Sequence, residues 1–266
     1  MKDAKKQYLE YLDSEEGIWK YNEFKKILYG KDDSLIPKLF RIVYPKVKNK
    51  KELDVLDVGG GDGRRLKHLM DLFKKKGIDS KAHLVEPSKA FISECKKKTD
   101  QKKHSLRIEK KTFEKFSTKD KYDVIFLIHS IYTFKNRSYL DKIKKMLKED
   151  GLAIFVTNGD GSFLAGLKKI MDKRYSAPRN EVTSLMKELT KNKCEVKKFD
   201  TKFSGVLSRN EFNQKGKLIM EWIGLDDFSK ISLETKEMAR KYFVRKNKKG
   251  FLCDKEVVVM TKFELK

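Results

Sequence analysis

A glycine-rich segment, LDVLDVGGGDGR at residues 53–64, constrains the fold of this chain more than any other stretch. The apolar residues before the glycines predict a short buried strand at Asp54–Val58, and the spacing from Arg64 to Met70 predicts a helix after them. Glycine permits positive φ angles and lets a ligand touch the main chain. Because the first N–H groups of a helix are unpaired, a turn of this kind suits a nucleotide-like ligand.

Short strands and helices alternate along the rest of the chain. Four strands that follow the first one are predicted at Ala82–Glu86, Ser105–Lys110, Tyr122–Ile128 and Leu152–Val156. Helices are predicted at Lys89–Lys98 and Tyr139–Lys148, and Asp150-Gly151 is expected to end the second helix. Two last strands are predicted at Cys194–Phe199 and Glu256–Phe263. This rhythm predicts an α/β fold with a doubly wound, mostly parallel, seven-stranded sheet.

The chain is long enough for one large domain with an insertion. We expect N-terminal lid helices at 1–50, a ligand-binding core at 51–158, a substrate-covering helical insertion with the sixth strand at 159–255, and the final core strand at 256–266. Ligands of open α/β sheets bind at the carboxyl ends of the strands, so the insertion is expected to close over that edge.

The formal net charge of +24 raises the question of a nucleic-acid partner. Only ten of the 63 basic residues are arginine, the residue that makes bidentate phosphate and base contacts. The lysines are scattered through every predicted helix. A general lysine bias with solvated helix faces is therefore the favoured interpretation, and RNA binding is the alternative.

The cysteines and the hydropathy indicate a cytoplasmic protein. Cys95, Cys194 and Cys253 lie far apart without the spacing of a zinc or redox site, so reduced thiols and no metal site are expected. No stretch approaches the roughly 20 apolar residues of a membrane span, and no membrane association is expected. The oligomeric state is not readable from the sequence.

Two acidic residues narrow the choice of ligand for the glycine turn. The spacing from Gly59 through Gly61 to Gly63 is G-x-G-x-G, whereas the dinucleotide fingerprint is G-x-G-x-x-G. Asp57, two residues ahead of Gly59, suits a cation better than a pyrophosphate. Glu86 ends the second strand, where a carboxylate can accept both ribose hydroxyls of an adenosine group, in NAD as well as in S-adenosylmethionine.

The segments LDVLDVGGGDGR and LVEPS resemble motif I and the ribose-binding motif of class I S-adenosylmethionine-dependent methyltransferases. Together with YDVIFLIHSIYTFKN and VTNGDGSFLAGLKKIMDKR, they resemble the histamine N-methyltransferase-like family more narrowly. The resemblance implies a Rossmann-like fold and S-adenosylmethionine as the cofactor. The residues expected to hold it are Asp57, Gly59, Gly60, Gly61, Gly63, Glu86, Pro87, Ser88, Thr112 and Ile128.

The methyl acceptor is expected next to the end of the fourth strand, which reads IHSIY at residues 128–132. Methyltransferases that act on exocyclic amines of flipped bases usually carry [DN]-P-P-[YFW] there. The histamine enzyme carries a substrate-facing glutamine at the position of His129. Side chains alternate along a strand, so His129 should point away from Ile128 and toward the acceptor, where it could take or hold the amine proton.

The segment YLDSEEGIWKYNEF resembles the lid helix of that family, in which a glutamate faces the amine. Gly17 matches the glutamate position and Glu16 is its neighbour. Trp19 and Tyr21 fit an aromatic wall over a cationic amine and equally a helix face packed on the sheet. The residues expected around the substrate are Glu16, Trp19, Tyr21, His129, Tyr132, Asn158 and Asp160.

The predicted function is transfer of a methyl group from S-adenosylmethionine to a small-molecule amine by in-line displacement. One alternative is an RNA methyltransferase acting on tRNA or rRNA through the basic surface. The other alternative is a non-catalytic relative that only binds the cofactor.

Overall fold

The computed structural model describes residues 9–29, 34–99, 105–131, 138–159, 162–171, 194–203, 212–224, 228–246 and 252–261. The chain divides into two compact units. The core unit is Leu35–Thr157, Pro178–Lys197 and Val257–Lys266, and the helical unit is Met1–Ser34, Asn158–Ala177 and Lys198–Glu256. The domain boundaries expected from the sequence stay a prediction.

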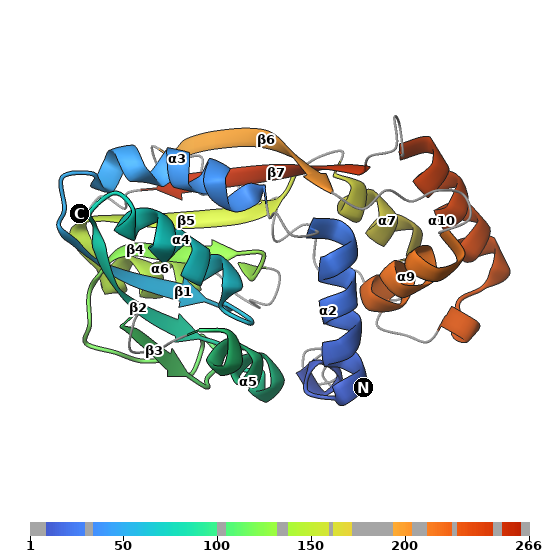
Figure 1. Cartoon of the computed structure of the whole chain (residues 1–266), viewed down its shortest axis with the longest axis horizontal. Coiled ribbons are helices and arrows are strands. Elements are labelled where there is room, and N and C mark those ends of the chain that lie inside the picture. Colours follow the sequence, from blue (N-terminus) through green and yellow to red (C-terminus); the bar gives the residue numbers. More distant parts are fainter. Residues whose placement is uncertain are drawn as a thin grey trace. The chain divides into compact units, whose positions relative to one another are not determined.

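A seven-stranded sheet has the order β3-β2-β1-β4-β5-β7-β6 (Figure 1). The pairs β1 with β2, β1 with β4, β2 with β3 and β4 with β5 are parallel. The predicted doubly wound, mostly parallel α/β fold is therefore confirmed. The strands are β1 (Glu52–Val58), β2 (Asp79–Val85), β3 (Leu106–Glu109), β4 (Tyr122–Ile128), β5 (Leu147–Asn158), β6 (Glu195–Phe203) and β7 (Leu252–Thr261).

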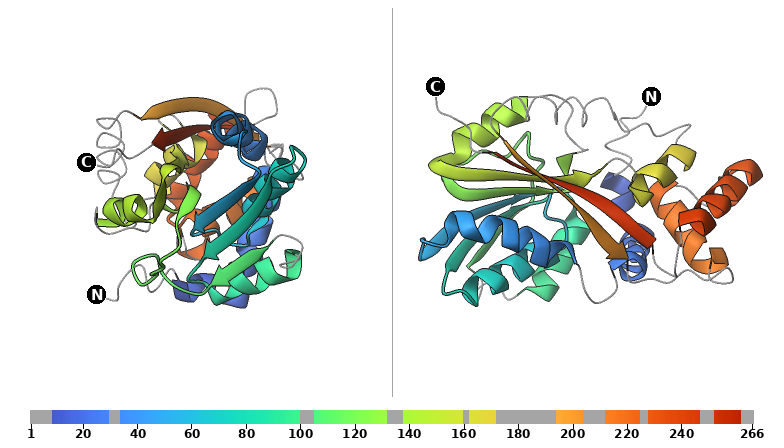
Figure 2. Two further views of the ribbon diagram at one scale, coloured as in Figure 1. Left: turned by 90° about the vertical axis from the view of Figure 1, so that its left-hand side faces the viewer. Right: turned by 90° about the horizontal axis from the view of Figure 1, so that it is seen from above.

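Helices cover both faces of the sheet in the core unit. They are α3 (Leu35–Val47), α4 (Arg64–Lys74), α5 (Lys89–Lys98) and α6 (Ser138–Met146). Figure 2 shows α3 and α4 on one face and α6 on the opposite face. Every residue of β4 is buried, which explains why its sequence is almost continuously apolar. Ile143 of α6 belongs to the same apolar core as Leu127 and Phe155.

The predicted boundary between α6 and β5 is wrong. The helix ends at Met146, and Asp150-Gly151 lies inside β5 instead of closing a helix. Leu147 pairs with Tyr122, whereas Leu152 pairs with Val124, so the register shifts between the two pairs. Leu147 is buried in this pairing, and the extra residues of β5 form an irregularity in the ladder.

The helical unit contains α2 (Glu15–Tyr29), α7 (Phe163–Met171), α9 (Lys217–Gly224) and α10 (Leu233–Lys246), with short helices at Phe212–Gly216 and Phe228–Lys230. Their apolar faces form a core of their own, which includes Phe24, Phe163, Leu167, Met220 and Phe243. The predicted helices between residues 159 and 255 are therefore present, and α2 shares their core.

The structure adds two facts to the expectations about thiols and membranes. Cys95 and Cys194 are free thiols. Within the described ranges, the helices lack the length and apolar character that crossing a bilayer would need. The cytoplasmic location stays a prediction.

Candidate functional site

The glycine turn joins β1 to α4 through left-handed backbone. The φ angles are 69° at Gly59, 57° at Gly61 and 68° at Gly63, a region that side chains other than glycine rarely adopt. The carbonyl of Gly63 accepts a hydrogen bond from the N–H of Lys67 at 2.9 Å, so the turn leads directly into α4. A Cβ at Gly63 would also lie 2.4 Å from Sγ of Cys95. Both the backbone and the space require glycine there.

Glu86 follows β2, and its side chain accepts hydrogen bonds from two main-chain N–H groups. Its side chain accepts from Gly61 N at 3.0 Å and from Ser88 N at 2.9 Å, and the residue is 5% exposed. Ser88 in turn caps α5, because its Oγ accepts from Phe91 N at 3.2 Å. A carboxylate oxygen has two lone pairs and can accept more than one hydrogen bond. The carboxylate is thus oriented beside the glycine turn, and its chemistry suits hydroxyl groups.

Asp57 lies beneath the same turn. It is 3% exposed, and its Oδ2 would lie 2.6 Å from a Cβ placed on Gly60. Burial, and to a smaller extent the charge of Glu86, raises the pKa of Asp57 to about 7, although the charge of Arg65 acts in the opposite direction. The two carboxylates give this edge of the sheet a negative character, which suits a cationic ligand.

The raised pKa makes the stability of the protein depend on pH through Asp57. In the unfolded chain the pKa is 3.8, so the stabilisation from this group is complete below pH 3.8 and is lost as the pH rises to about 7. The loss should reach about 4 kcal/mol of unfolding free energy. Asp57→Asn should lack this loss and gain stability over the wild type at pH 7. Urea unfolding across a pH series measures both proteins; parallel pH profiles would contradict the assignment.

The end of β4 touches the glycine turn. A Cβ at Gly59 would lie 2.6 Å from Cβ of Ser130, and His129 N donates to Val156 O at 3.0 Å. His129 has a φ of 56°. The strand alternation assumed for His129 is therefore wrong, because the backbone has already left the extended conformation. The structure nevertheless places the His129-Ser130 segment directly beside the turn.

The other residues predicted for the cofactor lie at the carboxyl edge of the core unit. Ile128 ends β4, Pro87 lies between Glu86 and Ser88, and Thr112 follows β3. The carbonyl of Thr112 accepts from Phe116 N at 3.0 Å. The ten predicted cofactor residues thus gather at the carboxyl ends of β1, β2, β3 and β4.

Sequence reasoning missed the role of Asp62 in the turn. Its side chain is buried and pairs with Arg64 at 3.3 Å and with Lys98 of α5 at 3.5 Å. These contacts tie the turn to the end of a helix that lies more than thirty residues away. Ser130 was missed as well, because only the fold brings it against Gly59.

The predicted substrate residues of α2 have partners inside the helical unit. Glu16 pairs with Lys20 at 2.6 Å, and Lys20 also pairs with Glu221 of α9 at 3.2 Å. Burial alone would lower the pKa of Lys20, but the hydrogen bonds to both carboxylates raise it. The Glu16 carboxylate, which is expected near the substrate amine, is thus already paired with an ammonium group of the protein.

Two aromatic residues of α2, Trp19 and Tyr21, have different surroundings and do not form one aromatic surface. Trp19 is 55% exposed. The ring of Tyr21 packs against Trp222 with centroids 5.1 Å apart, and the ammonium of Lys25 lies 4.6 Å from its centroid. Tyr21 therefore already has a cationic partner.

Three predicted residues remain. Asn158 is the last residue of β5 and is half-buried. Tyr132 and Asp160 lie outside the described residues. In the described part of the chain, no group of three histidine, cysteine or carboxylate side chains could hold a metal ion.

Residues 30–192, more than half of the chain, match the family described as "Methyltransferase domain". None of the curated proteins compared with the chain matches it. Solved structures with a similar fold include the plantazolicin methyltransferase BpumL in complex with a triazolic desmethylPZN analogue and SAH. It is 14% identical with a TM-score of 0.54, and the match covers 97% of this chain and 96% of that one.

Two further structures are similar. A SAM-dependent methyltransferase from Thiobacillus denitrificans with S-adenosyl-L-homocysteine is 11% identical with a TM-score of 0.51, covering 91% of this chain and 97% of that one. The YcgJ protein from Bacillus subtilis is 17% identical with a TM-score of 0.52, covering 84% of this chain and 97% of that one. At such low sequence identities, these similarities show a shared fold and nothing more specific.

Proposed function

We propose that this chain, which belongs to the methyltransferase-domain family, methylates a small-molecule amine. It is a class I S-adenosylmethionine-dependent methyltransferase, and S-adenosylmethionine is the cofactor. The narrower likeness to the histamine N-methyltransferase-like family is part of the proposal, as are the N-methylation and the small size of the acceptor.

The observation that carries the proposal is the packing of the β4 end on the glycine turn. Ser130 abuts Gly59, and Gly61 donates to Glu86. A cofactor whose ribose hydroxyls bind Glu86 and whose methionine part follows the turn would thus have His129 as a neighbour. Asp57 and Glu86 provide negative charge for a donor that carries a sulfonium and an ammonium group.

The reaction on an amine is an in-line displacement. The amine lone pair forms the new N–C bond while the C–S bond of the sulfonium breaks, and S-adenosylhomocysteine leaves with that electron pair. The proton lost by the amine goes to His129 or to water. The protein must mainly align an unprotonated nitrogen about 3–3.5 Å from the methyl carbon.

A small acceptor is supported by the sequence IHSIY in place of a base-flipping element. The second candidate, RNA methylation, is supported by the net charge of +24. Amine methylation, RNA methylation and cofactor binding without catalysis differ in which molecule, if any, receives a labelled methyl group.

A transfer assay with methyl-labelled S-adenosylmethionine tests the proposal. Biogenic amines, polyamines, amino acids and tRNA are offered separately, and S-adenosylhomocysteine binding is measured in parallel. We expect label in an amine. Label only in tRNA would replace the proposal with RNA methylation, and cofactor binding without transfer to any acceptor would favour the non-catalytic reading.

A further inference from the structure

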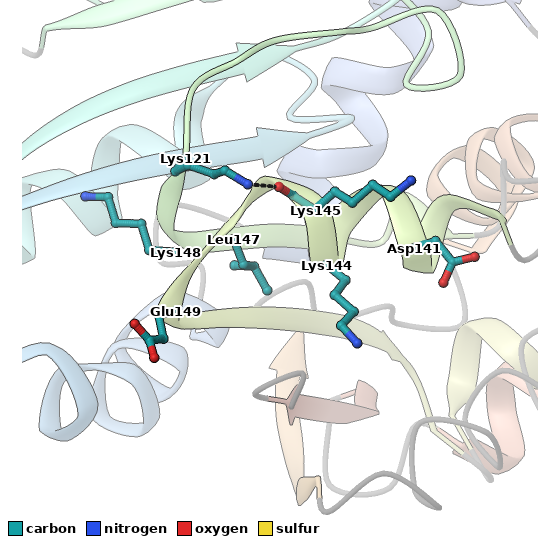
Figure 3. A pocket seen from close by; sticks show the side chains of 7 residues that line it. All are labelled: Lys121, Asp141, Lys144, Lys145, Leu147, Lys148 and Glu149. Carbon is teal, nitrogen blue, oxygen red and sulfur yellow. Dashed lines mark hydrogen bonds between the residues drawn. The ribbon is translucent and has the colours of Figure 1, made fainter. Parts of the chain in front are cut away.

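A hollow of about 740 Å³ lies at the amino-terminal edge of β4 and β5. Lys121 comes just before β4, three lining residues come from α6, and others come from the start of β5 (Figure 3). Its charged lining residues are Lys121, Asp141, Lys144, Lys145, Lys148 and Glu149. The glycine turn follows β1 at the opposite edge, where the parallel strands have their carboxyl ends.

A second hollow of about 440 Å³ shares Asp141 and Lys145 with the first. It adds Lys142 and the hydroxyl residues Ser117, Thr118 and Ser138. Because the two hollows share lining residues, they form one continuous surface. We call this surface the basic hollow.

One lysine of the basic hollow is neutralised by carboxylates. The ammonium of Lys148 lies 2.6 Å from Asp54 and 2.8 Å from Asp123, and Asp123 also binds Lys50 at 2.7 Å. This network joins the starts of β1, β4 and β5. Lys148 therefore has a structural role, and we do not count its charge toward a ligand.

Two other lysines are fixed without being neutralised. Lys121 donates to the carbonyl of Lys145, and Lys142 donates to the carbonyls of Phe113 at 2.5 Å and Glu114 at 3.1 Å. A carbonyl acceptor orients an ammonium group but leaves its full positive charge. These contacts hold two cations in place at the rim of the hollow.

Lys144 and Lys145 complete the set from the last turn of α6. Across the residues that the structure describes, neither ammonium is paired with a carboxylate. The basic hollow is thus lined by four lysines whose charges no ion pair among the described residues neutralises: Lys121, Lys142, Lys144 and Lys145. The acidic residues in its lining are Asp141 and Glu149. The excess of positive charge predicts an anionic partner.

The chemistry of the lining distinguishes phosphates from an acidic protein. Ammonium and hydroxyl groups are the donors that contact phosphate oxygens. Met146 and Leu147, the apolar lining residues, are buried, so the hollow offers no exposed apolar anchor of the kind that dominates protein interfaces. Neither lining set contains an aromatic side chain on which a base could stack. Contacts with phosphates rather than with bases are therefore expected.

The geometry points to the basic hollow as a docking surface for the phosphate backbone of a nucleic acid, bound without regard to its sequence. Seven residues of β4 separate this surface from the glycine turn, about 23 Å along the strand. The surface is therefore distinct from the methyl-transfer site, and its existence does not depend on which acceptor the enzyme methylates.

The test replaces two cations and compares a matched pair. Lys144→Gln/Lys145→Gln removes the two unpaired lysines from the last turn of α6. Lys96→Gln/Lys97→Gln removes the same charge from the last turn of α5 and is the control. Fluorescence anisotropy with a labelled single-stranded RNA, repeated across a salt series, gives the affinity and its salt dependence for each protein.

We expect the α6 double variant to bind the RNA about tenfold more weakly and to lower the slope of log affinity against log salt by about 1.4, since each phosphate contact contributes about 0.7. The control should change the slope far less. A DNA strand of the same sequence should bind equally, because the contacts are with phosphates.

Three results would overturn the proposal. The first is an equal loss in both double variants, which would mean that the whole lysine-rich surface attracts the strand. The second is an unchanged slope in the α6 variant. The third is binding of polyglutamate as tight as that of RNA, which would indicate an acidic protein partner. Unchanged thermal unfolding of each variant confirms that the fold is intact.

Discussion

A Glu86→Ala enzyme should bind S-adenosylhomocysteine about 100-fold more weakly than the wild type. The substitution removes the acceptor for Gly61 N and Ser88 N and the expected acceptor for the ribose hydroxyls. Hydrogen bonds to a charged group contribute about 1.5–3 kcal/mol each, and about 3 kcal/mol corresponds to the stated factor. Calorimetric titration with S-adenosylhomocysteine measures the change.

Glu86→Gln separates the effect on the ligand from the effect on the turn. The amide keeps one acceptor oxygen, so one of the two N–H bonds can persist, but the negative charge is lost. We expect an affinity between those of the wild type and Glu86→Ala, with little loss of unfolding free energy. If Glu86→Ala bound the product within a few-fold of the wild type, Glu86 would serve only the turn and not the ribose.

The sequence predicts the core elements well where local chemistry leaves one choice. The structure has β4 at Tyr122–Ile128 and α5 at Lys89–Lys98, as the sequence predicts. Continuous burial dictates the apolar run of β4, and Ser88 supplies the N-cap of α5. Glycine is required at Gly63 by both φ and the contact with Cys95. Local signals and tertiary structure agree at these points.

The α6 and β5 boundary shows where local signals fail. Asp150-Gly151 is a turn signal, and the helical spacing of Leu140, Ile143 and Leu147 extends the predicted helix too far. The pairing of Leu147 with Tyr122 decides the outcome. That pairing joins segments more than twenty residues apart, so no local pattern could reveal it.

In the candidate site, too, some residues can be predicted from the local sequence, whereas others depend on tertiary contacts. The glycines, Asp57 and Glu86 could be found from their order along the chain, since parallel strands place their carboxyl ends together. The partners of Glu16 could not, because Lys20 also contacts Glu221, about two hundred residues away. The Tyr21 contacts with Lys25 and Trp222 likewise depend on how α2 and α9 pack. Assignments to an amine at these residues therefore stay predictions.

A His129→Ala enzyme should lose most of its turnover and keep its affinity for S-adenosylhomocysteine within a few-fold of the wild type. His129 follows Ile128 beside the glycine turn, and its Nε2 atom is buried. Removing a general base or an amine-orienting group lowers turnover by about 100-fold or more. Single-turnover methyl transfer and product titration measure the two quantities separately.

His129→Asn distinguishes proton transfer from positioning. Asparagine tolerates the φ of 56° at this residue and retains hydrogen-bonding groups, but it cannot take a proton. If His129 accepts the amine proton, His129→Asn should lose as much turnover as His129→Ala. If His129 only orients the amine, His129→Asn should recover much of the turnover that His129→Ala loses. Unchanged turnover in both variants, or a fall in cofactor affinity as large as the fall in rate, would place His129 on the cofactor side of the site or outside it.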